Sequence, residues 1–183
     1  MAFRFDLVKS NHIILFLLHS LGGIADIAQL FLLLYLADLR HLAQYGTLIL
    51  GDSYIALKYG PAPFHLLGII KQLQEGNPKD NAHFKALLNL VITEKKQISA
   101  SGPYNPHHLA DSEVGCMFDV IRQYKGLPLE GLSIVAKDKA WHSADVNGEI
   151  SIYDMAEASG ASSAMIAYIT QSFNDELNSF DHK

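Results

Sequence analysis

The chain has 183 residues, 49% of them hydrophobic, and a formal net charge of −5 at pH 7. This length and composition predict a single domain, spanning residues 1–183, with one hydrophobic core. Because Cys116 is the only cysteine, the composition excludes an intramolecular disulfide and favours a reducing, cytoplasmic location.

Apolar residues recur at helical spacing in the first quarter of the chain. The pattern predicts a helix over 6–21 and a longer helix over 25–45. Gly46 follows the second helix directly, and glycine readily adopts the left-handed conformation that ends many helices. These two helices are expected to form the centre of the core.

The stretch 13–37 also resembles a membrane-spanning segment, because Asp26 is its only formal charge. Gly22 and Gly23 interrupt it near the middle, however, and Asp26 would lie deep in hydrocarbon at a cost of about 3 kcal/mol. We therefore expect two buried helices joined by a turn and no association with a membrane. The amino-terminal residues also lack the apolar run and the small-residue cleavage site of a signal peptide.

The middle of the chain alternates between short elements and turns. The pattern predicts a short strand over 54–57, a stiff turn over 60–63 and a helix over 64–74. Residues 76–80 are polar and typical of a turn, and residues 82–90 indicate a further helix.

Residues 90–100 alternate weakly between apolar and polar side chains. This alternation predicts a hairpin that pairs with the strand near Ile55. After a loop, Asp111 is expected to cap a helix over 113–124, which Gly126 closes.

The last part of the chain contains a short segment with Leu132 and Trp141, followed by two helical patterns over 150–177 that are separated at Gly160. Up to residue 139 there are 13 Lys and Arg against 12 Asp and Glu, whereas the rest has one Lys against seven acids. Such an acidic end repels phosphate backbones and attracts a basic partner, or it serves only as a solvated surface.

A helix-turn-helix is one interpretation of this end, because Ala156, Gly160, Ile166 and Ile169 have its spacing. The recognition helix, beginning at Ala161, would contain no Lys or Arg until the last residue of the chain, although phosphate neutralisation supplies most non-specific affinity for DNA. We expect no nucleic-acid binding by the chain alone. A DNA-binding regulator remains an alternative only if basic residues elsewhere or another subunit supply the positive surface.

One stripe of the second predicted helix carries polar side chains in line with core residues. The members of this stripe are Ile27, Phe31, Leu34, Asp38, His41 and Tyr45. Asp38 and His41 could serve as the acid–base pair of a hydrolase, which is the alternative function. We favour a structural role, because buried polar groups ordinarily require hydrogen-bond partners, and the turn at Tyr59–Pro61 is the candidate partner for Asp38.

Several short motifs together resemble the Panacea domain of SocA-like antitoxins, a family that also includes phage-associated proteins. The similar motifs are Tyr35-Leu36-Ala37-Asp38 with His41, Tyr45-Gly46, Gly51-Asp52, Lys58-Tyr59-Gly60-Pro61-Ala62-Pro63, the helix start Leu109 to Glu113, and Leu132-Ser133 with Ala140-Trp141. The resemblance implies a mainly α fold with a small antiparallel β-sheet (α+β) in one compact domain.

The resemblance implies a non-enzymatic antitoxin that neutralises a cognate toxin by direct contact, or that hands the toxin to a protease as an adaptor. The residues implied to carry the family motif and candidate partner contacts are Tyr35, Asp38, His41, Tyr45, Gly46, Asp52, Tyr59, Gly60, Pro61, Pro63 and Trp141. One departure stands out. The family usually has a Ser-His or Thr-His pair before the tryptophan, where this chain reads Ile134 to Lys139.

The nine histidines show neither an HExxH motif nor a Cys/His cluster, and only His107 and His108 are adjacent. We therefore assign no metal, no cofactor and no catalytic residue. Cys116 precedes Met117 and Phe118 on an apolar helix face, which is typical of a core residue.

Overall fold

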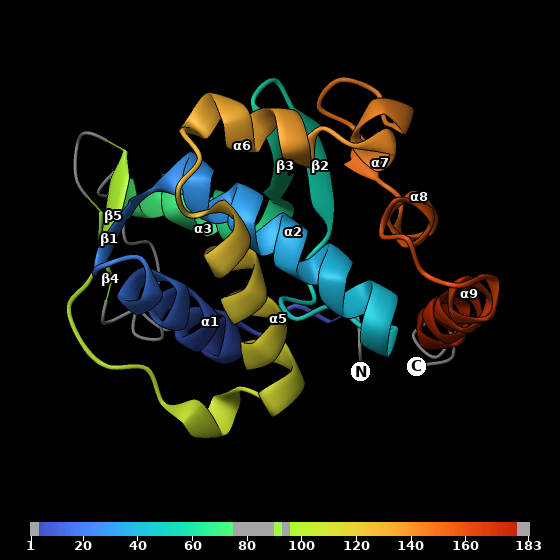
Figure 1. Ribbon diagram of the computed structural model, residues 1–183, viewed down its shortest axis with the longest axis horizontal. Coiled ribbons are helices and arrows are strands. Elements are labelled where there is room, and N and C mark those ends of the chain that lie inside the picture. Colours follow the sequence, from blue (N-terminus) through green and yellow to red (C-terminus); the bar gives the residue numbers. More distant parts are fainter. Residues whose placement is uncertain (1–3, 75–89, 93–95, 179–183) are drawn as a thin grey trace.

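Helix α2 runs through the centre of the molecule, and most other elements pack around it (Figure 1). The structure is a computed structural model that describes residues 4–74, 90–92 and 96–178. The described helices are α1 (Leu7–Ser20), α2 (Ile27–Tyr45), α3 (Phe64–Gln74), the 3₁₀ helix η1 (Pro106–His108), α5 (Asp111–Tyr124), α6 (Leu129–Ala136), α7 (Lys139–Ser143), α8 (Ile152–Ala158) and α9 (Ser163–Asn178).

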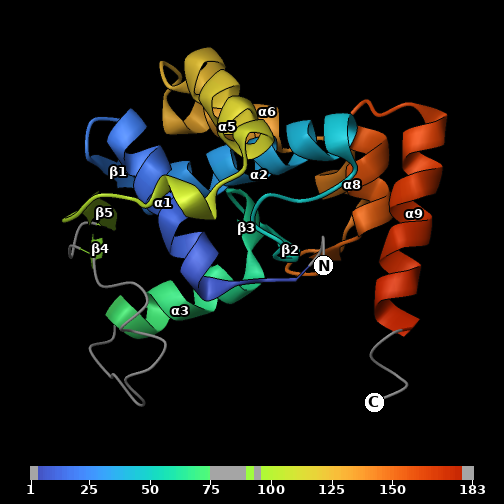
Figure 2. The ribbon, with the colours of Figure 1, turned by 90° about the horizontal axis from the view of Figure 1, so that it is seen from below.

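Two small antiparallel sheets accompany these helices, so the predicted α+β class is confirmed, although one sheet was expected. Their strands are β1 (Ile24–Asp26), β2 (Tyr54–Leu57), β3 (Gly60–Pro63), β4 (Leu90–Ile92), β5 (Gln97–Ala100) and β6 (Glu149–Ile150). The first sheet has the order β1-β5-β4 and the second the order β3-β2-β6. The first sheet and α9 lie on opposite sides of α2 (Figure 2).

The core is built around α2, which packs on α5, β3 and α6, and both α1 and α2 are apolar on nearly all sides. Ile13 to Leu18 and Leu30 to Ala37 are all buried. No helix of the described residues is both long and apolar enough to cross a membrane. Gly22 and Gly23, both with positive φ, separate the two helices as predicted.

The start of α2 differs from the prediction. The helix begins at Ile27, whereas we expected it to begin at Ala25, because residues 24–26 form β1 and pair with β5. Asp26 caps the helix by accepting hydrogen bonds from the backbone N–H groups of Ala28 and Gln29. A single acidic residue thus ends a strand and starts a helix, which helical periodicity alone does not show.

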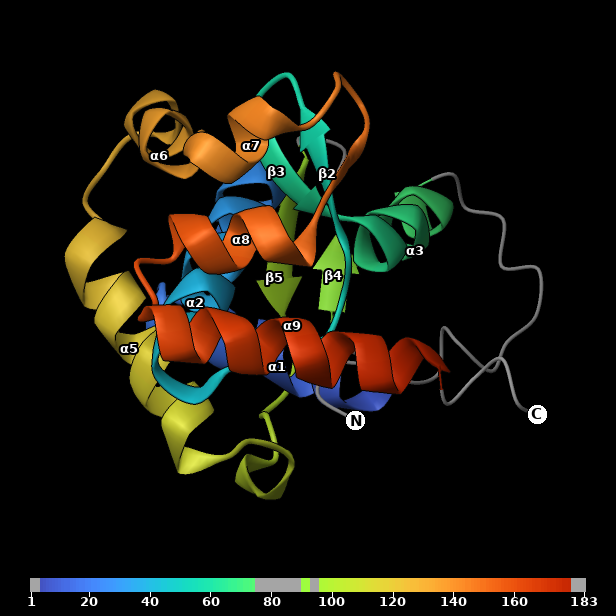
Figure 3. The same cartoon turned by 90° about the vertical axis from the view of Figure 1, so that its right-hand side faces the viewer.

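The strand over 54–57 and the helix over 64–74 are confirmed. The predicted turn over 60–63 is instead strand β3, which pairs with β2 so that Tyr54 lies opposite Pro63 and Leu57 opposite Gly60. Proline is tolerated there because β3 is an edge strand and need not donate from both edges. α3 extends outward beyond this hairpin (Figure 3).

The predicted hairpin over 90–100 exists as β4 and β5, but its predicted partner is wrong. β5 pairs with β1, with Ala25 opposite Ile98, whereas the strand near Ile55 pairs with β3 and β6. The expected turn over 76–80 and all but the last residue of the expected helix over 82–90 lie outside the described residues; Leu90 itself begins β4.

The later helices agree with the sequence in place but not in every boundary. α5 begins at Asp111 and its cap position is Ala110, so Asp111 is the first helical residue and not the cap. The segment with Leu132 and Trp141 forms two helices, α6 and α7. The two helices expected over 150–177 are present as α8 and α9, separated at Gly160.

Candidate functional site

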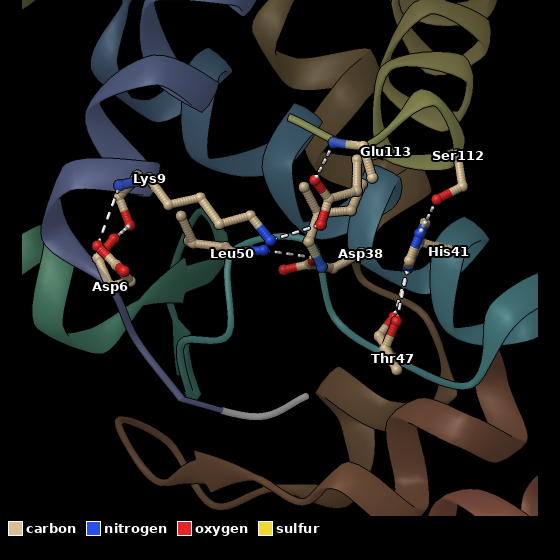
Figure 4. Close-up of polar contacts among 11 residues, drawn as sticks. Asp6, Lys9, Asp38, His41, Thr47, Leu50, Ser112 and Glu113 are labelled. Atoms are coloured by element: carbon tan, nitrogen blue, oxygen red, sulfur yellow. Dashed lines mark hydrogen bonds and ion pairs between the residues drawn. The ribbon is translucent and has the colours of Figure 1, made fainter. Parts of the chain in front are cut away.

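Asp38 lies on the face of α2 that meets the loop before β2. Its side chain is fully buried, and one carboxylate oxygen accepts hydrogen bonds from the backbone N–H groups of Ile49 and Leu50 (Figure 4). The other oxygen accepts a hydrogen bond from the Tyr54 hydroxyl at 2.7 Å. The expected partner, the turn at 59–61, is therefore wrong: Asp38 holds the loop over 49–50 and strand β2 against α2.

Burial raises the pKa of the Asp38 carboxyl to about 6, even though its three hydrogen bonds favour the ionised form. The buried hydroxyl of Tyr54 likewise has a pKa raised well above its usual value, by burial first and by the neighbouring carboxylate second. Tyr54 is thus a donor to Asp38 and does not ionise. The carboxyl group is enclosed by donors and has no route to a substrate.

His41 lies one turn further along α2 and contacts a different set of atoms. Its Nδ1 is 2.8 Å from the carbonyl oxygen of Thr47, and its Nε2 is 3.2 Å from the hydroxyl of Ser112 on α5. The contact with a carbonyl requires the proton on Nδ1, so Nε2 accepts from Ser112. Burial lowers the pKa of His41, which favours this neutral form. His41 therefore joins α2 to the following loop and to α5.

Tyr35 makes a third connection from α2. Its hydroxyl is 3.0 Å from both carboxylate oxygens of Asp138, and Asp138 also caps α7 by accepting from the backbone N–H of Trp141. The indole N–H of Trp141 in turn donates to the carbonyl oxygen of Leu57 at 3.1 Å. The motif tyrosine and the motif tryptophan are thus linked through one aspartate, which joins α2, α7 and the hairpin.

Asp52 accepts hydrogen bonds from the first residues of α3 and so fixes the start of that helix. It is buried, and its oxygens accept from the backbone N–H groups of His65 and Leu66 and from His65 Nδ1 at 2.7 Å. A carboxylate at this position satisfies the free donors of the first turn and complements the helix dipole.

At two motif glycines, a side chain of a neighbouring helix lies so close to the backbone that there is no room for a Cβ atom. Gly60 has φ 126°, and a Cβ atom there would lie 2.6 Å from a methyl carbon of Leu32 on α2. Gly46 has φ 72°, as predicted for a left-handed cap, and a Cβ atom there would lie 2.7 Å from the ring of Tyr168 on α9. Both glycines combine a left-handed backbone with a packing contact that a side chain would block.

The remaining motif residues fall into two groups. Pro61 and Pro63 are buried within β3, whereas the side chains of Tyr45 and Tyr59 are 49% and 66% exposed. The Tyr45 ring lies 4.7 Å from that of His41. Tyr59 is at the tip of the β2–β3 hairpin, which the hydroxyl of Ser133 on α6 fixes by donating to the Tyr59 carbonyl at 2.7 Å.

Sequence patterns do not predict the ion pair between Lys9 on α1 and Glu113 on α5, whose charged atoms are 2.5 Å apart. Glu113 also accepts from the backbone N–H of Ala110 at 2.9 Å, which starts α5. A glutamate three residues into a helix is a recognisable capping signal. Its lysine partner lies 104 residues away, and local spacing cannot identify such a contact.

An apolar groove lies between α2, β3 and α3, beside Tyr59. Its volume is about 220 Å³, and its walls include Phe31, Leu32, Leu57 and Leu67. A more polar recess of about 660 Å³ lies near Lys9 and Glu113. A sequence signal for the groove does exist. The first two turns of α3 contain several apolar residues, and only Leu66 and Ile70 of this helix are buried in the core.

The arrangement does not support acid–base chemistry by Asp38 and His41. The two side chains have separate hydrogen-bond partners, and both are almost wholly buried. Within residues 4–74, 90–92 and 96–178, no group of three or more His, Cys, Asp or Glu side chains could hold a metal ion. Cys116 is buried as expected, and burial raises the pKa of its thiol.

A comparison with protein families finds a match to the family described as antitoxin SocA-like, Panacea domain, over residues 30–142. The matched stretch begins in α2 and ends in α7, so it contains all the motif residues described above. No curated protein and no solved structure matches the chain.

Proposed function

This chain belongs to the antitoxin SocA-like Panacea domain family, and we propose from that premise that it neutralises a cognate protein toxin by binding it directly. The family match over residues 30–142 is the observation that carries the proposal. The implied partner is a toxin that the same cells produce, and the implied location is the cytoplasm. No catalytic step is required of the chain.

The geometry of the motif supports a binding role over a hydrolase. The polar motif residues Tyr35, Asp38, His41 and Asp52 use their polar atoms in internal hydrogen bonds. A catalytic pair would instead open into a cleft with a reacting group within reach. The motif leaves two aromatic side chains exposed, Tyr45 and Tyr59, and Tyr59 lies beside an apolar groove. Exposed aromatic and apolar groups are typical of protein contacts.

The proposal is tested by purifying the tagged chain from its own cells at native expression and identifying co-purifying proteins by mass spectrometry. We expect a stoichiometric protein that stops growth when expressed alone and no longer does so when the chain is co-expressed. Tyr59→Ser is a matched variant that should keep the wild-type fold but recover less of the partner. A preparation without any partner, or a partner whose toxicity the chain does not relieve, would contradict the proposal.

Neutralisation by contact and delivery to a protease predict different fates for the toxin. If contact alone is sufficient, the half-life of the toxin after translation is blocked is unchanged or longer when the chain is present. If the chain acts as a proteolytic adaptor, that half-life shortens and recovers when the protease is deleted. We propose contact as the basic activity, and this measurement decides whether degradation is added to it.

The α8–α9 pair does not favour DNA binding. α9 contains no Lys or Arg over residues 163–178, and its Ile169 is buried. The first part of α9 also contacts the end of α2, because the ring of Tyr168 lies over Gly46. We propose that this pair serves packing, and absence of DNA binding at low salt is the expected result.

A further inference from the structure

α3 is less buried than α1 and α2, the two other strongly apolar helices. Among its side chains only Leu66 and Ile70 are buried, whereas Phe64 is 53% exposed. The apolar groove between α2, β3 and α3 lies on one side of this helix, and a second recess of about 620 Å³ with apolar walls lies on its other side. An exposed apolar surface of this kind marks a contact site.

The charges at the groove identify the chemistry of its ligand. Lys71 and Lys96 are exposed at its rim and form no ion pair with any residue that the structure describes. The acid at the groove, Asp26, already accepts two backbone hydrogen bonds as the cap of α2. Among the residues that the structure describes, the groove therefore offers apolar walls and two lysines without an ion-pair partner, which complements a ligand with carboxylates.

Lys96 is held in place by its backbone. It has φ 61°, a left-handed conformation that is uncommon for residues other than glycine. Its carbonyl accepts a hydrogen bond from the backbone N–H of Ile27 at 3.0 Å, at the start of α2. The backbone of Lys96 is thus fixed at the end of the groove where α2 begins, and its side chain is exposed there.

The form of the ligand follows from the groove walls. An added β-strand would need main-chain donors on the open edge of β3, but two of the four residues of that strand are Pro61 and Pro63, which have none. Helices α2 and α3 form the other walls, and such grooves bind amphipathic helices through apolar side chains at spacings of three and four.

We propose that the groove between α2, β3 and α3 binds an amphipathic helix of the partner protein, with its apolar side chains against Phe31, Leu32 and Leu67 and its carboxylates near Lys71 and Lys96. This inference rests on the proposed function, since it names the surface and the segment through which a toxin is held. Tyr59 closes one side of the groove and contacts the same helix.

The test uses two fluorescently labelled peptides and the full chain. Both peptides form amphipathic helices with the same leucine face, but one carries Glu on its polar face and the other carries Lys at the same positions. We expect fluorescence anisotropy to show binding of the acidic peptide about tenfold tighter than of the basic one, because rim charges contribute modestly but add up. This preference should weaken as salt is raised.

Charge reversal at the rim provides the decisive variants. In Lys71→Glu/Lys96→Glu the preference should disappear or reverse, whereas Lys139→Glu, an exposed change on α7 outside the groove, should leave it intact. Tyr59→Ser should weaken both peptides. Circular dichroism checks that each variant is folded. Equal binding of the two peptides, or an equal effect of Lys139→Glu, would overturn the proposal.

Failure of this inference differs from failure of the proposed function. If neither peptide binds, the inference is wrong even if the chain neutralises a toxin. If the acidic peptide binds through Lys71 and Lys96 but no toxin is found, the groove is a binding site and the antitoxin role is wrong.

Discussion

The family motif includes polar residues on α2 and residues of the β2–β3 hairpin beside the groove. These two groups differ in how far a partner protein could reach them. Tyr35, Asp38 and His41 are buried and hydrogen-bonded to three other segments. Tyr59 is exposed at the edge of an apolar groove. The difference teaches that a family motif can combine residues that build the fold with residues that are free to bind, and the two groups require different experiments.

The largest effect is expected for Asp38→Ala. This change leaves two backbone N–H groups and the Tyr54 hydroxyl buried without their acceptor. Each buried donor without a partner costs about 1–3 kcal/mol, so we expect the free energy of unfolding to fall by about 3–5 kcal/mol. Urea denaturation measures this, with Asp175→Ala on the exposed face of α9 as the control. A loss no greater than that of the control would show that these three hydrogen bonds of Asp38 do not stabilise the fold.

Gly60→Ala should have the next largest effect. The new methyl group would meet Leu32, and the residue has φ 126°, so we expect a loss of about 2 kcal/mol or more in the free energy of unfolding. Gly115→Ala is the matched control, because a Cβ atom in α5 meets nothing within 4 Å. That control should gain about 0.5–1 kcal/mol from helix propensity. Equal shifts in melting temperature for the two variants would contradict the close approach.

Asp38 should also make stability depend on pH. Its folded-state pKa of about 6 lies above the ordinary value of 3.8, so its contribution is fully present below pH 3.8 and is lost as the pH rises through 6. His41 acts in the opposite sense, because its lowered pKa makes stability fall as the pH drops below its ordinary value of 6.5.

The contribution of Asp38 is isolated by comparing the wild type with Asp38→Asn at each pH. From pH 7 to pH 5 the wild type should gain about 1 kcal/mol in the free energy of unfolding relative to the variant. His41 is present in both proteins and cancels in this difference. Parallel pH profiles for the two proteins would show that Asp38 titrates in its usual range.

A smaller effect is expected for Tyr35→Phe, which removes the hydrogen bond to Asp138 but leaves that carboxylate bonded to the backbone of Trp141. We expect a loss of about 1 kcal/mol in the free energy of unfolding. Tyr168→Phe, at an exposed tyrosine, should cost almost nothing. If thermal unfolding gave the same small change for both, the link between α2 and α7 would not contribute to stability.

The sequence predicted features that depend on neighbouring residues. Gly46 as a left-handed cap, the strand at 54–57 and the helix at 64–74 follow from local backbone preferences and agree with the structure. It also placed Asp38 among core residues that need partners, and Asp38 is fully buried and bonded.

Features that depend on distant residues were not predictable in this way. The predicted partner of Asp38 is wrong because the loop at 49–50 carries no local signal of a donor site. The predicted partner of β5 is wrong because β1 has only three residues, too few to show alternation. The links from Tyr35 to Asp138 and from Lys9 to Glu113 each span more than 100 residues. Single-sequence patterns hold no information about such pairs.

The most direct test of the account is the affinity of the co-purified partner for Tyr59→Ser, measured by isothermal titration calorimetry beside the wild type and Tyr35→Phe. We expect Tyr59→Ser to unfold at the wild-type temperature and to bind about tenfold more weakly or worse, since exposed aromatic anchors dominate such interfaces. Tyr35→Phe should bind like the wild type despite its lower stability. Wild-type affinity in Tyr59→Ser, or lost affinity in folded Tyr35→Phe, would contradict this account. In it, the buried motif residues build the fold, and the exposed groove beside Tyr59 is the surface that we propose binds the partner.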